Sequence, residues 1–254
     1  MTFIDWLSGN ISNNDLPKSE YLYGARHIGI IITCIVAIIV LTVIFRNRSE
    51  KTKNRLFIVF ACIFLFFEIA SRVVNITFLK NPTFSKIMEE ILPLYFCSIA
   101  VWLLIISIFT KNKTLLTTAT ICGVLVTTAY LAFPAVGLNK RIVTFDAFYS
   151  IFSHSLGFVC SYLLITTKYV KFEYKHIWKT YLIVLGIITY GVISSLYLFP
   201  GNDFVFAINN PLEFDSVVPY PIIYAVFIAA FVNLFYLITF ICVKIKNRIR
   251  KKKN

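Results

Sequence analysis

The sequence predicts an all-α, polytopic integral membrane protein: a bundle of about seven transmembrane helices with its N-terminus outside and its C-terminus inside. Three observations predict this class. Of the 254 residues, 58% are hydrophobic and only 15% are charged, whereas a typical soluble domain is about 25% charged. The apolar residues form runs of roughly 20, the length that a helix needs to cross the hydrocarbon core. The basic residues lie between these runs and are distributed unevenly between two alternating sides.

Seven apolar runs are long enough to span a membrane. They do not alternate apolar and polar residues as barrel strands do, so we expect helices. We expect one transmembrane domain at 27–243, after a polar N-terminal segment at 1–26 and before a basic cytoplasmic tail at 244–254. The predicted spans are His27–Phe45, Leu56–Leu79, Leu92–Thr110, Leu115–Ala135, Ile142–Thr167, Ile177–Phe199 and Pro219–Val243.

Counting the basic residues between the spans predicts the orientation. If successive loops alternate between two sides, one side holds six Lys and Arg residues and the other holds eighteen. The side rich in Lys and Arg is normally cytoplasmic, which places the C-terminus inside. The net charge of +13 then reflects membrane orientation, and we expect no nucleic-acid partner. The basic tail is suited to contact with anionic lipid headgroups.

The cysteines give no sign of a metal site. The six cysteines are scattered singly, without a C-x-x-C pair or zinc-ligand spacing. We therefore expect no disulfide framework, no metal and no cofactor, with membrane lipids as the substrate and environment. The abundance of Ile, Lys, Asn, Phe and Tyr is typical of an AT-rich bacterial source. We accordingly expect a location in a bacterial plasma membrane.

Span two carries Glu68, Arg72 and Asn75 at positions i, i+4 and i+7, so the three share one helix face. Ionisable residues inside spans are rare and usually functional. One interpretation is a polar wall that lines a cavity. The other is a Glu68–Arg72 pair that neutralises itself and orients the helix. Arg72 lies toward the outer end of the span, where it can bind a lipid phosphate.

Span five carries a longer polar stripe. Asp146, Ser150, His154, Gly157 and Ser161 follow one helix face through most of the bilayer. Tight helix packing, which small residues favour, explains Gly157 and the serines. It explains His154 less well, because an imidazole near the middle of a membrane needs a polar partner. We therefore predict that His154 is functional.

The orientation gathers several polar residues at one depth. Arg72, Cys97, Asp146 and the loop at 200–218 fall in the outer half of the bilayer, and His154 lies near its middle. A single cavity open to the outer side would require this arrangement. Nothing local distinguishes Cys97 from the other five cysteines. The candidate substrate-binding residues are Arg72, Tyr95, Asp146 and Asn202.

Several short motifs occur in a distinctive order along the chain. They are Glu68 in span two, L-P-L-Y-F-C at 92–97, Y-L-A-F-P at 130–134, F-Y-S-I-F-S-H ending at His154, G-N-D-F-V-F-A-I-N-N-P at 201–211 and P-Y-P-I-I-Y at 219–224. In order and spacing, this set resembles the family that contains the bacterial YwaF-type integral membrane proteins and the animal transmembrane protein 164. The resemblance covers nearly all of the membrane region.

The family resemblance implies an integral membrane acyltransferase that acts on phospholipids. It implies an acyl chain carried on a cysteine with a histidine as partner, and His154 matches the position of that histidine. In the animal branch the cysteine directly follows the proline of span three, where this chain has Leu94. Cys97 lies three residues later on the same helix face. Tyr95 stands in place of the histidine of the bacterial pattern.

Two main hypotheses for the function follow. In the first, Cys97 attacks an acyl ester, His154 takes the thiol proton, and the acyl-thioester passes its chain to a lysolipid hydroxyl. In the second, the chain binds or transports a lipid or small molecule without covalent chemistry, and Cys97 is inert. A lysolipid hydrolase and a structural scaffold also stay open. A hydrogen bond between Cys97 and His154 would favour the first hypothesis.

Overall fold

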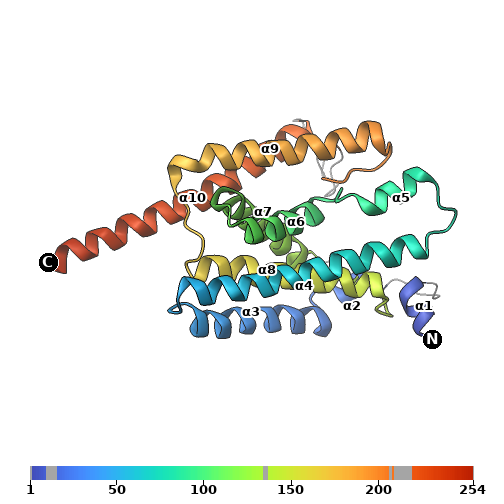
Figure 1. The fold of residues 1–254 in the computed structure, drawn as a ribbon, viewed down its shortest axis with the longest axis horizontal. Helices are drawn as coiled ribbons and strands as arrows, with labels where there is room; N and C mark the ends of the chain where they lie inside the picture. The colour runs from blue at the N-terminus through green and yellow to red at the C-terminus, as the bar shows by residue number, and fades with distance from the viewer. Residues whose placement is uncertain (1, 10–15, 134–136, 206–207, 209–218, 254) are drawn as a thin grey trace.

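Long apolar helices run back and forth along one common direction (Figure 1). The computed structural model describes residues 2–9, 16–133, 137–205, 208 and 219–253. The elements assigned within this part of the chain are all helical, which confirms the predicted all-α class. The α-helices are α1 (Phe3–Ser8), α2 (Lys18–Tyr21), α3 (Ala25–Phe45), α4 (Glu50–Thr77), α5 (Phe84–Ile91), α6 (Phe96–Thr110), α7 (Lys113–Ala132), α8 (Phe145–Thr166), α9 (Ile177–Ile193) and α10 (Tyr220–Lys253), with a 3₁₀ turn η1 (Tyr174–His176) and a π-helical turn η2 (Ser194–Leu198) at the two ends of α9.

The number of spans agrees with the prediction of about seven. In the described part of the chain, six helices are long and apolar enough to cross a membrane, namely α3, α4, α7, α8, α9 with its flanking turns, and α10. The bent pair of α5 and α6 makes a seventh if it counts as one span. The chain is therefore a multi-pass membrane protein.

The third span differs from the prediction. A single helix from Leu92 was expected, but α5 ends at Ile91, α6 begins at Phe96, and the two helices meet at an angle of 54°. Pro93 lies in the break. Proline lacks a backbone N–H and disfavours the helical conformation for the preceding residue, so it interrupts the helix here. Leu92 has extended backbone angles accordingly. With 15 residues, α6 alone is shorter than a full span.

Two other boundaries lie beyond the predicted ones. α4 begins at Glu50, six residues before the predicted start at Leu56, and the Ser49 hydroxyl caps it by accepting a hydrogen bond from the Thr52 N–H at 3.3 Å. α10 continues through the basic segment to Lys253. The predicted tail at 244–254 is thus a helical extension of the last span over its described length.

The polar N-terminal segment contains two short helices, α1 and α2. The Trp6 indole N–H donates to the Val143 carbonyl at 2.8 Å, and its ring packs edge-on against Phe145 with the centroids 5.5 Å apart. Since Phe145 is the first residue of α8, α1 covers the start of that helix.

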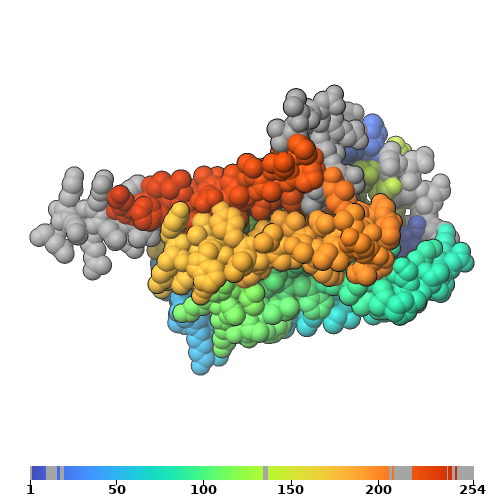
Figure 2. Space-filling view, turned by 90° about the horizontal axis from the view of Figure 1, so that it is seen from above, coloured from blue at the N-terminus to red at the C-terminus, as the bar shows by residue number. Residues whose placement is uncertain are grey.

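Helix α7 forms the centre of the bundle. It packs against α6, α8, α9 and α10, and 61% of its membrane-length window is buried, against 6% for α3. Figure 1 shows α7 and α6 between a layer of α3, α4 and α8 and a layer of α9 and α10. In Figure 2, α10 lies beside α9 across one face of the molecule. This arrangement leaves α3 at the edge of the bundle.

The alternating helix directions bring the predicted polar residues to one end. The N-terminal ends of α3, α6, α8 and α10 lie with the C-terminal ends of α4, α7 and α9 (Figure 1). Arg72 near the end of α4, Cys97 at the start of α6 and Asp146 at the start of α8 therefore lie toward the same end of the bundle. Which membrane side this end faces stays a prediction from the charge count.

Candidate functional site

Cys97 lies in the first turn of α6, immediately after the break in the third span. Tyr95 is the N-cap with extended backbone angles, so Cys97 is the second residue of the helix. The first backbone N–H groups of a helix have no partner within it. Those of Cys97 and Ser98 interact with the Cys97 sulfur. The first turn of α6 thus places two backbone N–H groups near the Cys97 sulfur.

The segment after α9, more than 100 residues later in the chain, contacts the start of α6 through Phe204. The Phe96 N–H donates to the Phe204 carbonyl at 3.1 Å, and the Phe204 N–H donates to the Ser195 hydroxyl at 3.2 Å. The Phe204 ring is fully buried and packs edge-on against Tyr95 with the centroids 5.3 Å apart. The G-N-D-F-V segment therefore positions the turn that carries Cys97.

A polar network joins α4, α6 and α8 next to this turn. The Glu68 carboxylate, only 1% exposed, accepts hydrogen bonds from the Arg72 guanidinium and the Tyr149 hydroxyl. Arg72 Nη2 donates to the Ser98 hydroxyl at 3.0 Å, and that hydroxyl donates to Glu68 at 3.4 Å. Because Ser98 follows Cys97 directly, the network also fixes the start of α6.

The contacts of Arg72 correspond to the interpretation of span two as a self-neutralised pair. Its guanidinium donates to Glu68, to Ser98 and, at 3.0 Å, to the Ile91 carbonyl. It also lies over the Trp102 ring, 5.5 Å from the centroid. Most of its N–H groups thus bind protein atoms, and a lipid phosphate at Arg72 stays an untested expectation.

His154 has the polar partners that an imidazole in this position needs. Its Nδ1 lies 2.7 Å from the Ser150 carbonyl oxygen, and since a carbonyl only accepts, Nδ1 carries the proton. In the neutral ring, Nε2 then has a free lone pair. No hydrogen bond to Nε2 is found within the part of the chain that the structure describes. The ring stacks on Tyr130 with the centroids 3.9 Å apart and the planes 13° apart.

Cys97 and His154 are not joined directly. No hydrogen bond links them among the described residues, and their helices α6 and α8 each pack against α7 and α4. Tyr130 of α7 stacks on His154 and interacts electrostatically with Cys97. Tyr149 of α8 also interacts with Cys97. Tyr130 and Tyr149 therefore lie within electrostatic range of Cys97, and Tyr130 also contacts the predicted base.

The other predicted binding residues lie at the surface. Tyr95 is exposed as the N-cap of α6, and Asp146 is exposed in the first turn of α8. Asn202 is exposed and donates to the Glu89 carboxylate at 3.3 Å. Of these three, Tyr95 lies closest to Cys97 in the chain, two residues before it. A role in substrate binding stays a prediction for each of them.

Part of the stripe on span five serves helix packing. A Cβ atom on Gly157 would lie 2.9 Å from Thr127 Cγ2, and one on Gly123 would lie 2.2 Å from the Ser161 hydroxyl oxygen. Gly157 and Ser161 thus lie where α7 and α8 approach most closely, as the packing interpretation requires. His154 lies on the same stripe, but it contacts the Ser150 carbonyl and the Tyr130 ring.

Comparison with protein families covers the elements that build this site. The model of the TMEM164 family matches residues 22–239, from the segment before α3 to most of α10. The chain belongs to the TMEM164 family. This membership confirms the resemblance that the ordered motifs indicate. No match was found among curated proteins or solved structures.

The sequence reasoning missed four residues of the site in this TMEM164-family protein: Ser98, Tyr130, Tyr149 and Phe204. Tyr130, Tyr149 and Phe204 lie inside the quoted motifs, which was the available signal. Their partners come from other helices, so their roles depend on contacts that one sequence does not specify. Among the described residues, no three His, Cys, Asp or Glu side chains are grouped closely enough to hold a metal ion.

Proposed function

We propose that this protein is a multi-pass membrane acyltransferase that moves a fatty acyl chain between phospholipids through Cys97. The observation that carries the proposal is the environment shared by Cys97 and His154. The thiol lies at the start of α6 near backbone donors, the imidazole has an open Nε2, and Tyr130, which stacks on the imidazole, lies within electrostatic range of the thiol. Membership of the TMEM164 family supports the same chemistry, because the family resemblance implies acyl transfer through a cysteine and a histidine.

The first half-reaction loads the cysteine. His154 Nε2 accepts the Cys97 thiol proton, and the sulfur attacks the carbonyl carbon of a phospholipid ester. The C–S bond forms as the ester C–O bond breaks, and the departing lysophospholipid oxygen takes the proton back from Nε2. Hydrogen bonds between catalytic groups are often long without substrate and shorten in the reacting complex, so we assign the thiol–imidazole contact to the lipid-bound state.

The second half-reaction unloads it. The hydroxyl of an acceptor lysolipid gives its proton to Nε2 and attacks the thioester carbon. The new C–O bond forms as the C–S bond breaks, and the proton passes from Nε2 to the sulfur, so both residues return to their starting state. The backbone N–H groups of Cys97 and Ser98 are suited to stabilise the oxyanion that forms in both steps.

The Glu68–Arg72 pair has a supporting role in this proposal. A carboxylate near Cys97 would oppose negative charge on the sulfur if it were unpaired. Glu68 interacts electrostatically with Cys97, but its charge is compensated by Arg72. The pair thus fixes the first turn of α6 without adding net charge beside the thiol.

The experiment is an acyl-transfer assay with purified protein in lipid vesicles. A labelled diacyl phospholipid serves as donor and a lysophospholipid as acceptor, and the labelled diacyl product is quantified. We expect Cys97→Ser and His154→Ala to lower the rate at least ~10²-fold, the lower range for loss of a catalytic base. Cys62→Ser and His176→Ala are matched controls, because Cys62 is an exposed cysteine on α4, His176 is a partly exposed histidine in the turn η1, and neither is among the site residues named above.

The chemical intermediate gives a second test. Incubation with the donor alone should leave one labelled acyl group on Cys97, removable by hydroxylamine as a thioester is. A label on another residue, or full activity in Cys97→Ser, would remove Cys97 from the mechanism. Release of free fatty acid without an acceptor would identify a hydrolase that uses the same acyl-enzyme.

The lack of a direct Cys97–His154 hydrogen bond among the described residues favours one alternative. In that alternative the protein binds or transports a lipid or small molecule, and Cys97 is inert. Cys97→Ser would then keep full function, and no thioester would form under any lipid supply. The intermediate test therefore separates the two functions.

A further inference from the structure

A groove between α3 and α8 has no part in the chemistry described above. It has a volume of about 420 Å³ and is open to the surroundings. Its walls include Arg26, Gly29 and Cys34 on α3, and Phe148 and Phe152 on α8. The residues lining the groove include neither Cys97 nor His154. It is a separate feature at the edge of the bundle.

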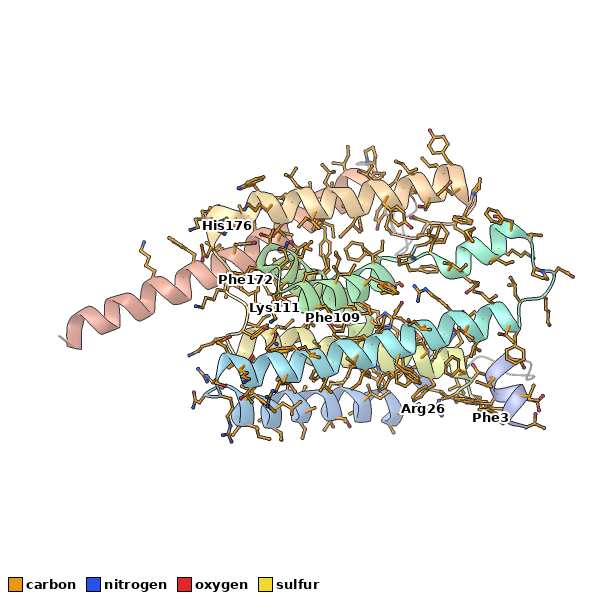
Figure 3. The ribbon with its side chains drawn as sticks, in the orientation of Figure 1. Phe3, Arg26, Phe109, Lys111, Phe172 and His176 are labelled. Carbon is orange, nitrogen blue, oxygen red and sulfur yellow. The ribbon has the colours of Figure 1, made fainter. Side chains whose placement is uncertain are left out.

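The groove has the depth of one lipid leaflet. Arg26 and Cys34 are eight residues apart on α3, which corresponds to ~12 Å along the helix axis. Half of the hydrocarbon core is ~15 Å thick. Its lining is mainly apolar, with Arg26 at one end and the hydroxyl groups of Thr33 and Ser155 farther along, and Figure 3 shows Arg26 at the N-terminal end of α3. The groove therefore runs from the interface toward the membrane midplane.

Positive charge lies at the shallow end of the groove. Arg26 is exposed, and its Nη1 donates to the Lys140 carbonyl at 3.1 Å. That is the one hydrogen bond of this guanidinium among the described residues, so other N–H groups are available to a ligand. Arg141, which follows the contacted residue, is also exposed. A guanidinium at this depth is suited to bind a phosphate with two parallel hydrogen bonds.

We propose that the groove binds one anionic glycerophospholipid, with an acyl chain between α3 and α8 and the headgroup phosphate on Arg26. The apolar walls match the chain, the depth matches one leaflet, and the charge at the mouth matches the phosphate. The proposal does not depend on acyl transfer, because the lipid is held away from Cys97.

Gly29 offers a way to block the groove. A Cβ atom added to Gly29 meets no other atom within 4 Å, although this residue lines the groove. The Cβ atom of Gly29→Leu therefore fits without a clash, and we expect the rest of the side chain to occupy the lipid's space. Gly186 on α9 is also exposed with open space at its Cβ. Gly186→Leu is thus the matched control for a larger side chain on a membrane helix.

The test is native mass spectrometry of the full-length protein in detergent, titrated with phosphatidylglycerol or phosphatidylcholine. We expect one phosphatidylglycerol molecule to stay bound to the wild type, more tightly than phosphatidylcholine. Arg26→Gln and Gly29→Leu should each weaken this binding about tenfold, the loss expected for one charge-assisted hydrogen bond or for a filled chain site. Gly186→Leu and Arg48→Gln, which changes an exposed arginine beyond the other end of α3, should bind like the wild type.

Three results would overturn the proposal: equal retention of the two lipids, binding unchanged in both Arg26→Gln and Gly29→Leu, or displacement of the lipid by glycerol 1-phosphate, which lacks an acyl chain. Cys97→Ser should retain the lipid normally. Failure of the acyl-transfer proposal would therefore leave this one intact, and the reverse also holds.

Discussion

His27 and His154 are both held by hydrogen bonds inside the bundle, with different consequences. His27 is fully buried, its Nδ1 accepts from the Tyr23 N–H at 2.9 Å, and its Nε2 lies 2.7 Å from the Leu131 carbonyl oxygen. Both nitrogens are therefore occupied, and the ring joins the start of α3 to the end of α7. His154 uses Nδ1 alone. Of these two histidines, His154 has a nitrogen available for proton exchange.

At the residue scale, burial of the Glu68 carboxylate also predicts the effect of a substitution on stability. Glu68→Gln keeps the shape of the side chain but leaves the Arg72 guanidinium without a counter-charge. Removing one partner of a buried ion pair costs about 3–5 kcal/mol. We therefore expect a clear fall in the thermal unfolding midpoint of the purified protein in detergent.

Glu173→Gln is the control for this change. Glu173 pairs with Lys175 at 3.0 Å, but the two side chains are 50% and 72% exposed, and exposed pairs contribute only about 0–1 kcal/mol. The midpoint of this variant should stay close to that of the wild type. If both variants shift equally, burial of the Glu68 pair is not what stabilises this part of the bundle.

At the scale of elements, the contact between α7 and α8 depends on small residues. Gly123 meets Ser161, and Gly157 meets Thr127, so the two helix backbones approach closely. The Ser161 hydroxyl is buried without a hydrogen-bond partner in the described part of the chain. Its size therefore matters at this contact more than its polarity.

This contact predicts a compensating pair of substitutions. Gly123→Ala places a methyl group 2.2 Å from the Ser161 oxygen, and overpacking of this kind costs about 1–3 kcal/mol. Ser161→Ala alone should change stability little, and the double variant should recover much of the loss because the clashing oxygen is gone. The measurement is a double-mutant cycle of thermal unfolding in detergent.

Gly186→Ala serves as the control, since its added methyl group meets open space. It should be neutral or stabilise the protein by up to about 1 kcal/mol, as alanine does relative to glycine within a helix. Additive effects of Gly123→Ala and Ser161→Ala would contradict the proposed contact.

The spans could be predicted from the sequence to different degrees. Six of the seven predicted spans correspond to helices long enough to cross a membrane, and the third corresponds to the bent pair of α5 and α6. The long apolar run that bilayer thickness requires is visible within each single segment. The break at Leu92–Tyr95 was not predicted. At this break the Phe96 N–H donates a hydrogen bond to the Phe204 carbonyl. These two residues are far apart in the chain, so the contact is not visible in either segment alone. Pro93 was a visible signal, but its effect was assigned to a helix start.

In the candidate site, too, features within one helix could be predicted from the sequence and contacts between helices could not. The period of the stripe on span five marked His154, because spacing along one helix is a local property. The position of Tyr130, stacked on His154 and within electrostatic range of Cys97, depends on how α7 packs between its neighbours. A single sequence does not state which helices are neighbours. The composition of the site was therefore only partly predictable.

At the scale of the whole molecule, the helix directions give the charge count a structural basis. The loops with eighteen basic residues and those with six correspond to the two ends of the bundle (Figure 1). In Figure 3, Lys111 and His176 lie toward one end and Arg26 toward the other. Such an asymmetry is a strong determinant of orientation. The end with Cys97 and the Arg26 groove should then face outward.

Reporter fusions test this orientation in living cells. Green fluorescent protein fused after residue 254 should fluoresce, because it folds in the cytoplasm, and alkaline phosphatase at the same position should be inactive. Phosphatase inserted between Lys140 and Arg141 should be active, because this loop belongs to the side with fewer basic residues. Replacing the seven basic residues from Lys244 onward by glutamine should weaken the bias, since they supply more than a third of the positive charge on that side. Active phosphatase at the C-terminus of the unmodified chain would reverse the orientation. It would move Cys97 and the Arg26 groove to the cytoplasmic leaflet while leaving their contacts unchanged.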